Sequence, residues 1–288
     1  MGLTQGYIRF IAFMQRTHRI HGDVLVLSQQ AIYADISQTV KMLSENGVVP
    51  AEIPHGFDTS NKIPDWNSTS AKKNINVKTL MALLGATSTR TSDISDYEGA
   101  DLKIDLGVPI DKSRYNQFDA IVDAGTIEHI YDIPQCMENI TKMLKVDGVL
   151  VLFAPASEIN HGFYNLCPCF FFDYLSANGY EDIRVYLKED AFNGESGGKT
   201  YEVMETWAQY GVPPTHTSVV VFARKKKTVV LTRNIIQSAY KRVWNPAERR
   251  ETALYSIARS FKRFIPDIIY KMRERSANRR YFKYVGWF

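Results

Sequence analysis

The sequence predicts an α/β fold built around a mostly parallel sheet. Two short and almost wholly apolar runs, at 118–122 and 149–153, are typical of strands buried on both faces. Between them, Asp132 begins a capping-box spacing with a proline in the first turn, and apolar residues follow at helical intervals up to Asp147-Gly148. Strand, helix and strand in this order predict a βαβ unit, whose strands run parallel through a right-handed crossover.

Further strands and helices extend this unit along the chain. Apolar or alternating runs predict strands at 22–27, 88–92, 102–104, 180–187 and 217–223, which makes seven in all. Helical spacing is expected at 3–20, 36–43, 77–84 and 168–178, with a short helix near 202–210. Residues 48–75 are rich in proline, asparagine, serine and threonine, and we expect a long loop there.

The order of these motifs resembles a known family. The stretch FDAIVDAGTIEHI at 118–130, the helix after it and VLVLFAP at 149–155 resemble the fourth and fifth strands of class I S-adenosylmethionine-dependent methyltransferases. TSDISDYEGADLKIDL at 91–106 resembles the second and third strands of the same family. The resemblance covers residues 22 to about 227. It implies a Rossmann-like, seven-stranded, mostly parallel sheet (class I methyltransferase-like) and S-adenosylmethionine as the cofactor.

The resemblance divides the chain into three parts. Residues 1–21 are expected to form an N-terminal helix, and 22–227 the methyltransferase-like domain with the loop insertion at 48–75. Residues 228–288 are expected to form a C-terminal helical tail that is basic and amphipathic. From Arg224 onward there are 18 Lys/Arg against 4 Asp/Glu, so an acidic body precedes a basic tail although the whole chain carries only +4.

The resemblance also implies a cofactor site at the ends of the strands. Ser28 stands where the family's first glycine is usual, and no GxGxG follows it. Asp93 follows the second strand, where an acidic side chain accepts hydrogen bonds from a ribose diol, and Asp105 resembles the family's acidic residue near the adenine amino group. The candidate cofactor-binding residues are Ser28, Gln29, Asp93, Ile94, Asp105, Leu106, Asp123 and Gly125. The alternative is a degenerate fold that no longer binds S-adenosylmethionine.

Two histidines follow strand ends and are candidates for catalysis. A hydroxyl acceptor has to lose its proton during methyl transfer, and histidine is suited to removing it near neutral pH. His129 comes just after the fourth strand, and His161 comes just after the fifth. Glu128 could orient such a base or help to bind a metal, but one Glu-His pair is weak evidence for a metal site, and the predicted chemistry requires no metal. A hydrogen-bonded structural role for either histidine remains the alternative.

The function expected from the sequence is methylation of a hydroxyl on a sugar or on another small or membrane-associated acceptor. Basic amphipathic helices with tryptophan and phenylalanine nearby are suited to an anionic membrane surface, so the tail favours peripheral membrane binding. A helical appendage on the domain or a dimer arm explains the tail equally well, and RNA binding is a third interpretation. RNA methylation and a non-catalytic scaffold are the alternative functions. Three cysteines are too few for a disulfide framework, no run is long enough to span a bilayer and no signal peptide is recognisable, so we expect a cytoplasmic protein.

Overall fold

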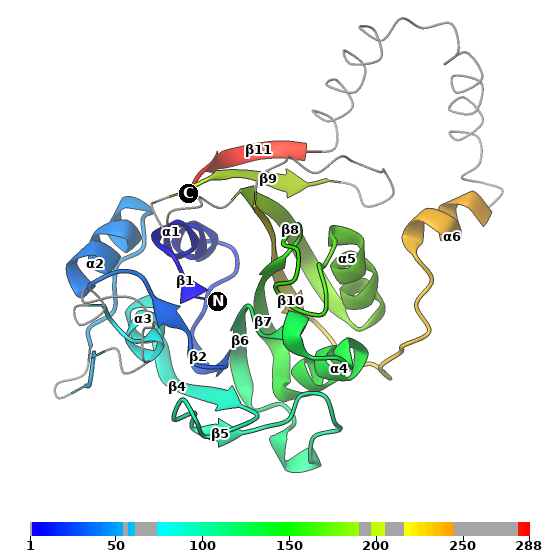
Figure 1. The fold of residues 1–288 in the computed structure, drawn as a ribbon, viewed down its shortest axis with the longest axis horizontal. Helices are drawn as coiled ribbons and strands as arrows, with labels where there is room; N and C mark the ends of the chain where they lie inside the picture. The colour runs from blue at the N-terminus through cyan, green and yellow to red at the C-terminus, as the bar shows by residue number, and fades with distance from the viewer. Residues whose placement is uncertain (1, 54–56, 61–73, 190–196, 205–215, 245–281) are drawn as a thin grey trace, which may run out of the picture.

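The computed structural model of the chain describes residues 2–53, 57–60, 74–189, 197–204, 216–244 and 282–288. Its centre is a nine-stranded sheet in the order β11-β9-β8-β10-β7-β6-β2-β4-β5 (Figure 1). The strands are β2 (Gly22–Leu27), β4 (Ala86–Asp93), β5 (Leu102–Lys103), β6 (Phe118–Ala124), β7 (Leu144–Pro155), β8 (Tyr180–Glu189), β9 (Lys199–Val203), β10 (Thr217–Lys225) and β11 (Phe282–Trp287). A second, two-stranded sheet pairs β1 (Gly2–Leu3) with β3 (Ala31–Ile32) in parallel.

Helices cover both faces of the large sheet (Figure 1). One face carries α1 (Gln5–Met14), α2 (Ile36–Glu45) and α3 (Val77–Leu84), and the other carries α4 (Ile133–Met143) and α5 (Pro168–Ala177). The helix α6 (Ser238–Trp244) and the 3-10 turns η2 (Lys112–Arg114) and η3 (Ile127–His129) complete the described elements. The result is a three-layer α/β/α arrangement.

The buried stretches of β2, β6 and β7 are almost wholly apolar because both faces of the sheet are covered. In β2, Val24 and Val26 pack in the core that contains α1, whereas Leu25 and Leu27 pack in the core that contains α4. All four side chains are fully buried. The continuous apolar runs from which the strands were predicted therefore reflect two separate cores, one on each side of the sheet.

The strand order confirms the predicted fold class. Strands β5, β4, β2, β6 and β7 are joined by parallel pairing, and β10 runs antiparallel to both β7 and β8. Numbered along the chain, the seven predicted strands lie in the order 3-2-1-4-5-7-6. The first five follow the order of doubly wound nucleotide-binding folds. The fold is Rossmann-like and class I methyltransferase-like.

Two strands beyond the predicted seven extend the sheet. Residues 199–203 form β9, although a short helix was expected from residue 202 onward; the remainder of that prediction, at 205–210, lies outside the described residues. Residues 282–287 form β11, which pairs antiparallel with β9. The prediction of a wholly helical tail is therefore wrong at its end, because the last residues supply backbone partners for an edge strand. Residues 245–281 lie outside the described part.

The N-terminal helix belongs to the main core rather than to a separate unit. Phe10 of α1 is fully buried, and its ring contacts those of Tyr186, Phe222 and Phe288 at centroid distances of 4.9, 5.8 and 5.0 Å. These partners come from β8, β10 and the last residue of the chain. The two ends of the chain therefore meet in one aromatic cluster, as the proximity of N and C in Figure 1 also shows.

Local signals explain where the helices begin and end. Asp132 caps α4 by accepting a hydrogen bond from the backbone N–H of Gln135 at 3.0 Å. The helix ends at Met143 rather than at the predicted Asp147-Gly148, because Leu144 already pairs with Phe118 of β6 and brings the chain into the sheet. Helix α3 ends, as predicted, at Gly85, whose φ of +102° suits glycine.

Candidate active site

The predicted site residues lie at the carboxyl ends of five neighbouring parallel strands. These strands are β5, β4, β2, β6 and β7, which are consecutive in the sheet (Figure 1). The connection from β2 leads to one side of the sheet and the connection from β6 to the other, so a topological switch point lies between them. Open α/β sheets bind their ligands at such a point, outside the carboxyl ends of the strands.

The turn after β2 has a glycine-like backbone without a glycine. Ser28 has a φ of +54°, in the left-handed region that glycine adopts most easily. The side-chain amide of the buried Gln30 donates to the carbonyl oxygen of Leu27 at 2.8 Å and to Oγ of Ser28 at 3.1 Å. Thr126, after β6, donates its hydroxyl to the same carbonyl at 3.2 Å. Side-chain hydrogen bonds thus stabilise a turn for which the family usually uses glycine.

Gln29 connects the end of β2 to the end of β4. Its Nε2 donates to Oγ1 of Thr91 and to the carbonyl oxygen of Gly99, both at 3.2 Å. The side chain therefore holds the turn after β2 against the loop that follows β4. This places Gln29 on the edge where a bound nucleoside would lie, and its contact with a cofactor stays a prediction.

Asp93 is the last residue of β4. Its Oδ1 accepts hydrogen bonds from the N–H and the hydroxyl of Ser95 at 2.9 and 3.2 Å, which leaves Oδ2 outside the described hydrogen bonds. The side chain of Ile94 is 63% exposed beside it. Burial and then the charge of Asp93 raise the pKa of Glu98, so a second carboxyl group lies near the first. A half-buried carboxylate whose Oδ2 makes none of the described hydrogen bonds could accept from a ribose diol, and this role of Asp93 stays a prediction.

Asp105 and Leu106 follow β5 and differ in their environment. Asp105 is exposed, and its Oδ1 accepts a hydrogen bond from the N–H of Gly107 at 2.8 Å. The side chain of Leu106 is buried in the core under α4, and its carbonyl oxygen accepts from Asn139 at 2.9 Å. Asp105 therefore stabilises its own turn, and its role toward an adenine stays a prediction.

Asp123 and Gly125 shape the turn at the end of β6. Asp123 is fully buried, and its two carboxylate oxygens accept from the N–H groups of Thr126 at 3.0 Å and Ile127 at 3.4 Å. Burial raises the pKa of Asp123 to about 6, although these hydrogen bonds act in the opposite direction. Gly125 has a φ of +97°. Asp123 thus caps the start of η3 and orients the residues that follow.

Glu128 lies in η3 and is completely buried. Its relative exposure is 0%, and neither carboxylate oxygen has a hydrogen-bond partner among the described residues. Burial, followed by the charge of Asp123, raises the pKa of Glu128 to about 8. A buried carboxyl group without a hydrogen bond is costly, because the water that it loses on burial is not replaced by another donor.

His129 and His161 both face Glu128. The Oε1 atom of Glu128 lies 3.5 Å from Nε2 of His161 and 3.8 Å from Nε2 of His129. The two imidazole centroids are 5.2 Å apart. Partial burial and the neighbouring His161 lower the pKa of His129, which favours its neutral form at pH 7. The structure therefore brings all three predicted catalytic residues together, and no described contact links Asp93 or Asp105 to them.

A fourth residue of this cluster was not predicted from the sequence. Oε2 of Glu158 lies 3.2 Å from Nδ1 of His161, so the carboxylate accepts the proton on that nitrogen. The sequence signal for this pair was a glutamate three residues before a histidine. This spacing indicates a contact only when the turn between the two residues is known. Asn165 fixes this turn by exchanging two hydrogen bonds with the backbone of Glu158, at 2.9 and 2.8 Å.

The loop after β7 is attached closely to η3. The N–H of Phe163 donates to the carbonyl oxygen of Glu128 at 2.9 Å. The hydroxyl of Tyr164 donates to the backbone carbonyl oxygen of Tyr131 at 2.8 Å. A Cβ atom on Gly162 would lie only 2.8 Å from the Glu128 carbonyl oxygen and 2.9 Å from its Cγ. Glycine is needed here because the two backbones approach each other. The histidine of one loop is thereby held against the carboxylate of the other.

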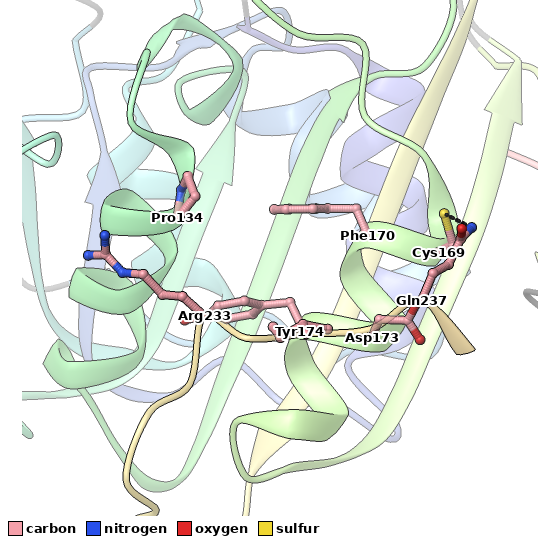
Figure 2. A pocket seen from close by; sticks show the side chains of 8 residues that line it. Pro134, Cys169, Phe170, Asp173, Tyr174, Arg233 and Gln237 are labelled. Carbon is pink, nitrogen blue, oxygen red and sulfur yellow. Dashed lines mark hydrogen bonds between the residues drawn. The ribbon is translucent and has the colours of Figure 1, made fainter. Parts of the chain in front are cut away.

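A hollow of about 250 Å³ is lined partly by residues of α4 and α5 (Figure 2). Its lining residues are Pro134, Cys169, Phe170, Asp173, Tyr174, Arg233, Ile235 and Gln237. The guanidinium of Arg233 is held by Gln135 at 2.5 Å and by Glu138 at 3.0 Å. None of the predicted site residues lines this hollow, so we place the active site at the strand ends instead.

No family model matches the sequence. The search of curated proteins likewise gives no match. Similar solved structures include the YcgJ protein from Bacillus subtilis, with 10% identity, a TM-score of 0.38 and coverage of 77% of this chain and 99% of that one. A SAM-dependent methyltransferase from Archaeoglobus fulgidus has 10% identity, a TM-score of 0.35 and coverage of 77% and 96%.

The CurJ carbon methyltransferase is also similar, with 12% identity and a TM-score of 0.35; the alignment covers 74% of this chain and 51% of that one. The chain spans about half the length of this structure and of two other polyketide-type or trans-acting methyltransferases, at 46% and 55%. The strand order described above, rather than these structural alignments, establishes the fold.

Within the described part of the chain, helices are too short or too polar to cross a bilayer.

Proposed function

We propose that this protein is an S-adenosylmethionine-dependent methyltransferase that acts on a hydroxyl group. The observation that carries the proposal is the cluster of Glu128, His129 and His161 at the carboxyl edge of a sheet with class I methyltransferase-like strand order. The turn at Ser28 and the carboxylate of Asp93 lie on the same edge, two and three strands from β7. Donor and acceptor sites would therefore be adjacent.

The chemistry demanded of the protein is modest. A sulfonium methyl group is already activated, so holding the acceptor oxygen in line with it supplies much of the rate. The acceptor hydroxyl has to lose its proton, and a histidine of the cluster can accept it. His129 is the candidate base, because its side chain is 46% exposed and its lowered pKa keeps it neutral. Glu128 and His161 would position it.

We further propose that the acceptor is a sugar or another small or membrane-associated hydroxyl compound. The support is the concentration of positive charge after residue 224, which would favour an anionic membrane surface. Removing residues 228–288 is a poor test, since it would also remove β11 from the sheet. Flotation with phosphatidylcholine vesicles, with and without phosphatidylserine, tests it on the full chain. Binding that needs phosphatidylserine supports the proposal. If the protein binds RNA but not these vesicles, the RNA alternative is favoured.

Titration calorimetry with S-adenosylmethionine tests the donor side. The wild type should bind saturably, and Asp93→Ala should bind at least 10-fold more weakly because the ribose diol loses its acceptor. Asp93→Asn is the sharper variant, since its amide oxygen can still accept from Ser95 and so preserve the turn. The exposed Asp96→Asn is the matched control and should bind as the wild type does. If the folded wild type does not bind, the protein is a scaffold and the proposal is wrong.

A further inference from the structure

We propose that Glu128, His129 and His161 bind a divalent transition-metal ion, of which Zn²⁺ is the representative. Each offers one ligand atom, and these atoms all lie within 4.8 Å of one another. Two imidazoles and one carboxylate form a ligand set that suits Zn²⁺ and its neighbours in the first transition row, whereas Mg²⁺ and Ca²⁺ prefer oxygen alone. The inference does not depend on the proposed function, because the ion would bind with or without S-adenosylmethionine.

The first argument is the missing partner of a buried carboxylate. Glu128 has no exposed surface, and its oxygens make no hydrogen bond to the described residues. The Nε2 atom of His161 is likewise buried and makes none. These two atoms nevertheless face each other at 3.5 Å. That separation exceeds the roughly 2.7 to 3.2 Å of an N–H···O hydrogen bond, so the pair is too far apart to share a proton well.

The second argument is the size of the gap. Ligand atoms bound at roughly 2.1 Å to a tetrahedral ion lie about 3.4 Å from one another. The distances from Oε1 of Glu128 to Nε2 of His161 and of His129 are 3.5 and 3.8 Å. His129 is the most exposed of the three side chains, at 46%. The two distances from Glu128 are therefore close to those of ligand atoms that share one cation.

The third argument is the hydrogen bond behind His161. Nδ1 of His161 lies 3.2 Å from Oε2 of Glu158, which fixes the proton on Nδ1 and leaves a lone pair on Nε2. Metal-binding histidines characteristically have such a carboxylate on the second ring nitrogen. The lone pair of Nε2 then points at the carboxylate of Glu128, an arrangement that a cation between the two atoms would stabilise.

The fourth argument is the rigidity of the frame. Asp123 caps η3 on one side, and the N–H of Phe163 ties the loop of His161 to the carbonyl oxygen of Glu128 on the other. Three ligands from the protein would leave at least one position on a tetrahedral ion open, as in catalytic zinc sites. A hydroxyl that reached this position would have its pKa lowered by the ion itself. With the ion bound, His129 would serve as a ligand, and the ion's lowering of the hydroxyl pKa would take the place of the base proposed above.

The test is direct metal binding by the full-length protein, stripped with a chelator and free of S-adenosylmethionine. Calorimetry with Zn²⁺ should give one site per chain, and Co²⁺ should give visible absorption bands of a four- or five-coordinate ion. Millimolar Mg²⁺ should not compete. Glu128→Gln and His161→Gln should each lower the affinity by at least 10-fold, and Glu158→Gln by a smaller factor. His21→Gln, an exposed histidine outside the cluster, is the matched control and should bind normally.

Two further variants keep the test decisive. His129→Gln changes a half-exposed side chain, so it is expected to fold even where the buried Glu128→Gln does not. Cys167→Ser/Cys169→Ser removes the other candidate pair of ligands, two thiols whose sulfur atoms lie 2.9 Å apart. The proposal is overturned if the folded wild type does not bind Zn²⁺ or Co²⁺. It is also overturned if the cysteine variant abolishes binding while the Glu128, His129 and His161 variants retain it.

Discussion

The Nε2 atom of His161 lies 3.5 Å from Oε1 of Glu128, and both atoms are buried without a hydrogen bond to the described residues. The two residues are far apart in the βαβ unit, on the loops after β6 and β7. They meet because these strands are parallel neighbours, so their carboxyl ends lie together. The candidate chemistry of this protein is concentrated in this one contact, and its geometry leads to the first prediction.

Gly162→Ala should weaken the cluster without changing any of its side chains. A Cβ atom at residue 162 would meet the backbone carbonyl oxygen of Glu128 at 2.8 Å, and backbone cannot yield as a flexible side chain can. The loop of His161 would move away from Glu128. Because outer contacts of this kind typically change metal affinity by about 10- to 100-fold, we expect a Zn²⁺ affinity lowered by about 10-fold or more.

Gly107→Ala is the control for this prediction, since its Cβ would meet side chains rather than backbone: Oδ1 of the exposed Asp105 at 3.2 Å and Cγ2 of Ile130 at 3.6 Å. Both variants are compared with the wild type by zinc calorimetry and by circular dichroism. Wild-type zinc affinity in a folded Gly162→Ala would show that the close approach of the two loops does not position the site.

Ser28→Gly should be tolerated, whereas Ser28→Val should not. The φ of +54° suits glycine, and glycine loses only the contacts of one hydroxyl with Gln30 and Thr126. A β-branched residue in this left-handed conformation costs about 1–2 kcal/mol or more. We therefore expect urea unfolding to show less than about 1 kcal/mol of change for Ser28→Gly and a clear loss for Ser28→Val.

The same variants test whether the turn supports the cofactor. S-adenosylmethionine should bind to Ser28→Gly about as tightly as to the wild type, because the backbone path is preserved. Equal stability of the glycine and valine variants would contradict the left-handed conformation on which the expectation rests.

His18 should make the protein less stable in mild acid. Its ring is fully buried, with Nε2 2.8 Å from the carbonyl oxygen of Asp182 and Nδ1 3.1 Å from the hydroxyl of Thr17. Burial lowers the pKa of His18 below 6.5, although the carboxylate of Asp182 acts in the opposite direction; Arg224 and Arg184 add to the lowering. The folded state therefore binds this proton less readily than the unfolded state does.

The sign of the effect follows from this difference. The contribution of His18 is fully present above pH 6.5 and is lost as the pH falls below 6.5 toward the folded-state pKa. Denaturant unfolding at pH 7 and 5 should show a loss of stability at the lower pH that His18→Gln reduces. The exposed His21→Gln should keep the wild-type slope. An unchanged slope in His18→Gln would contradict the prediction.

Phe10→Ala should destabilise the whole domain, although the helix that carries it lies before the first strand of the main sheet. The ring is fully buried against Tyr186, Phe222 and Phe288. Truncating such a residue costs about 3–5 kcal/mol. Val49→Ala is the control, because that side chain is 91% exposed and its loss should change stability by less than about 0.5 kcal/mol. Equal unfolding midpoints in urea would mean that α1 is not part of the core.

The sequence predicted the central strands and most helices because their signals are local. The strand at 22–27 is continuous and apolar since both faces of the sheet are covered, and Gly85 and Asp132 mark helix ends by their own backbone or side-chain chemistry. The strands β9 and β11 were missed because each depends on its partners: β9 pairs with β8 on one side and with β11, about 80 residues further along the chain, on the other. Nothing within either short run specifies such a partner.

The candidate site was predictable only in outline. His129, His161 and Glu128 were found because they follow strand ends, and strand ends of a parallel sheet gather at one edge. The contact of Glu158 with His161 and the glycine-like turn at Ser28 depend on loop conformations that residue types alone do not determine. The orphaned state of the Glu128 carboxylate is a property of burial, so it could emerge only from the folded structure.

The most direct test of the account is a crystal structure of the full chain grown with S-adenosylhomocysteine. We expect the nucleoside at the carboxyl ends of β2 and β4, with its ribose hydroxyls on the carboxylate of Asp93 and its sulfur directed toward Glu128, His129 and His161. A ligand bound elsewhere, such as in the hollow beside α4 and α5, or crystals that never take it up from saturating solution, would contradict it.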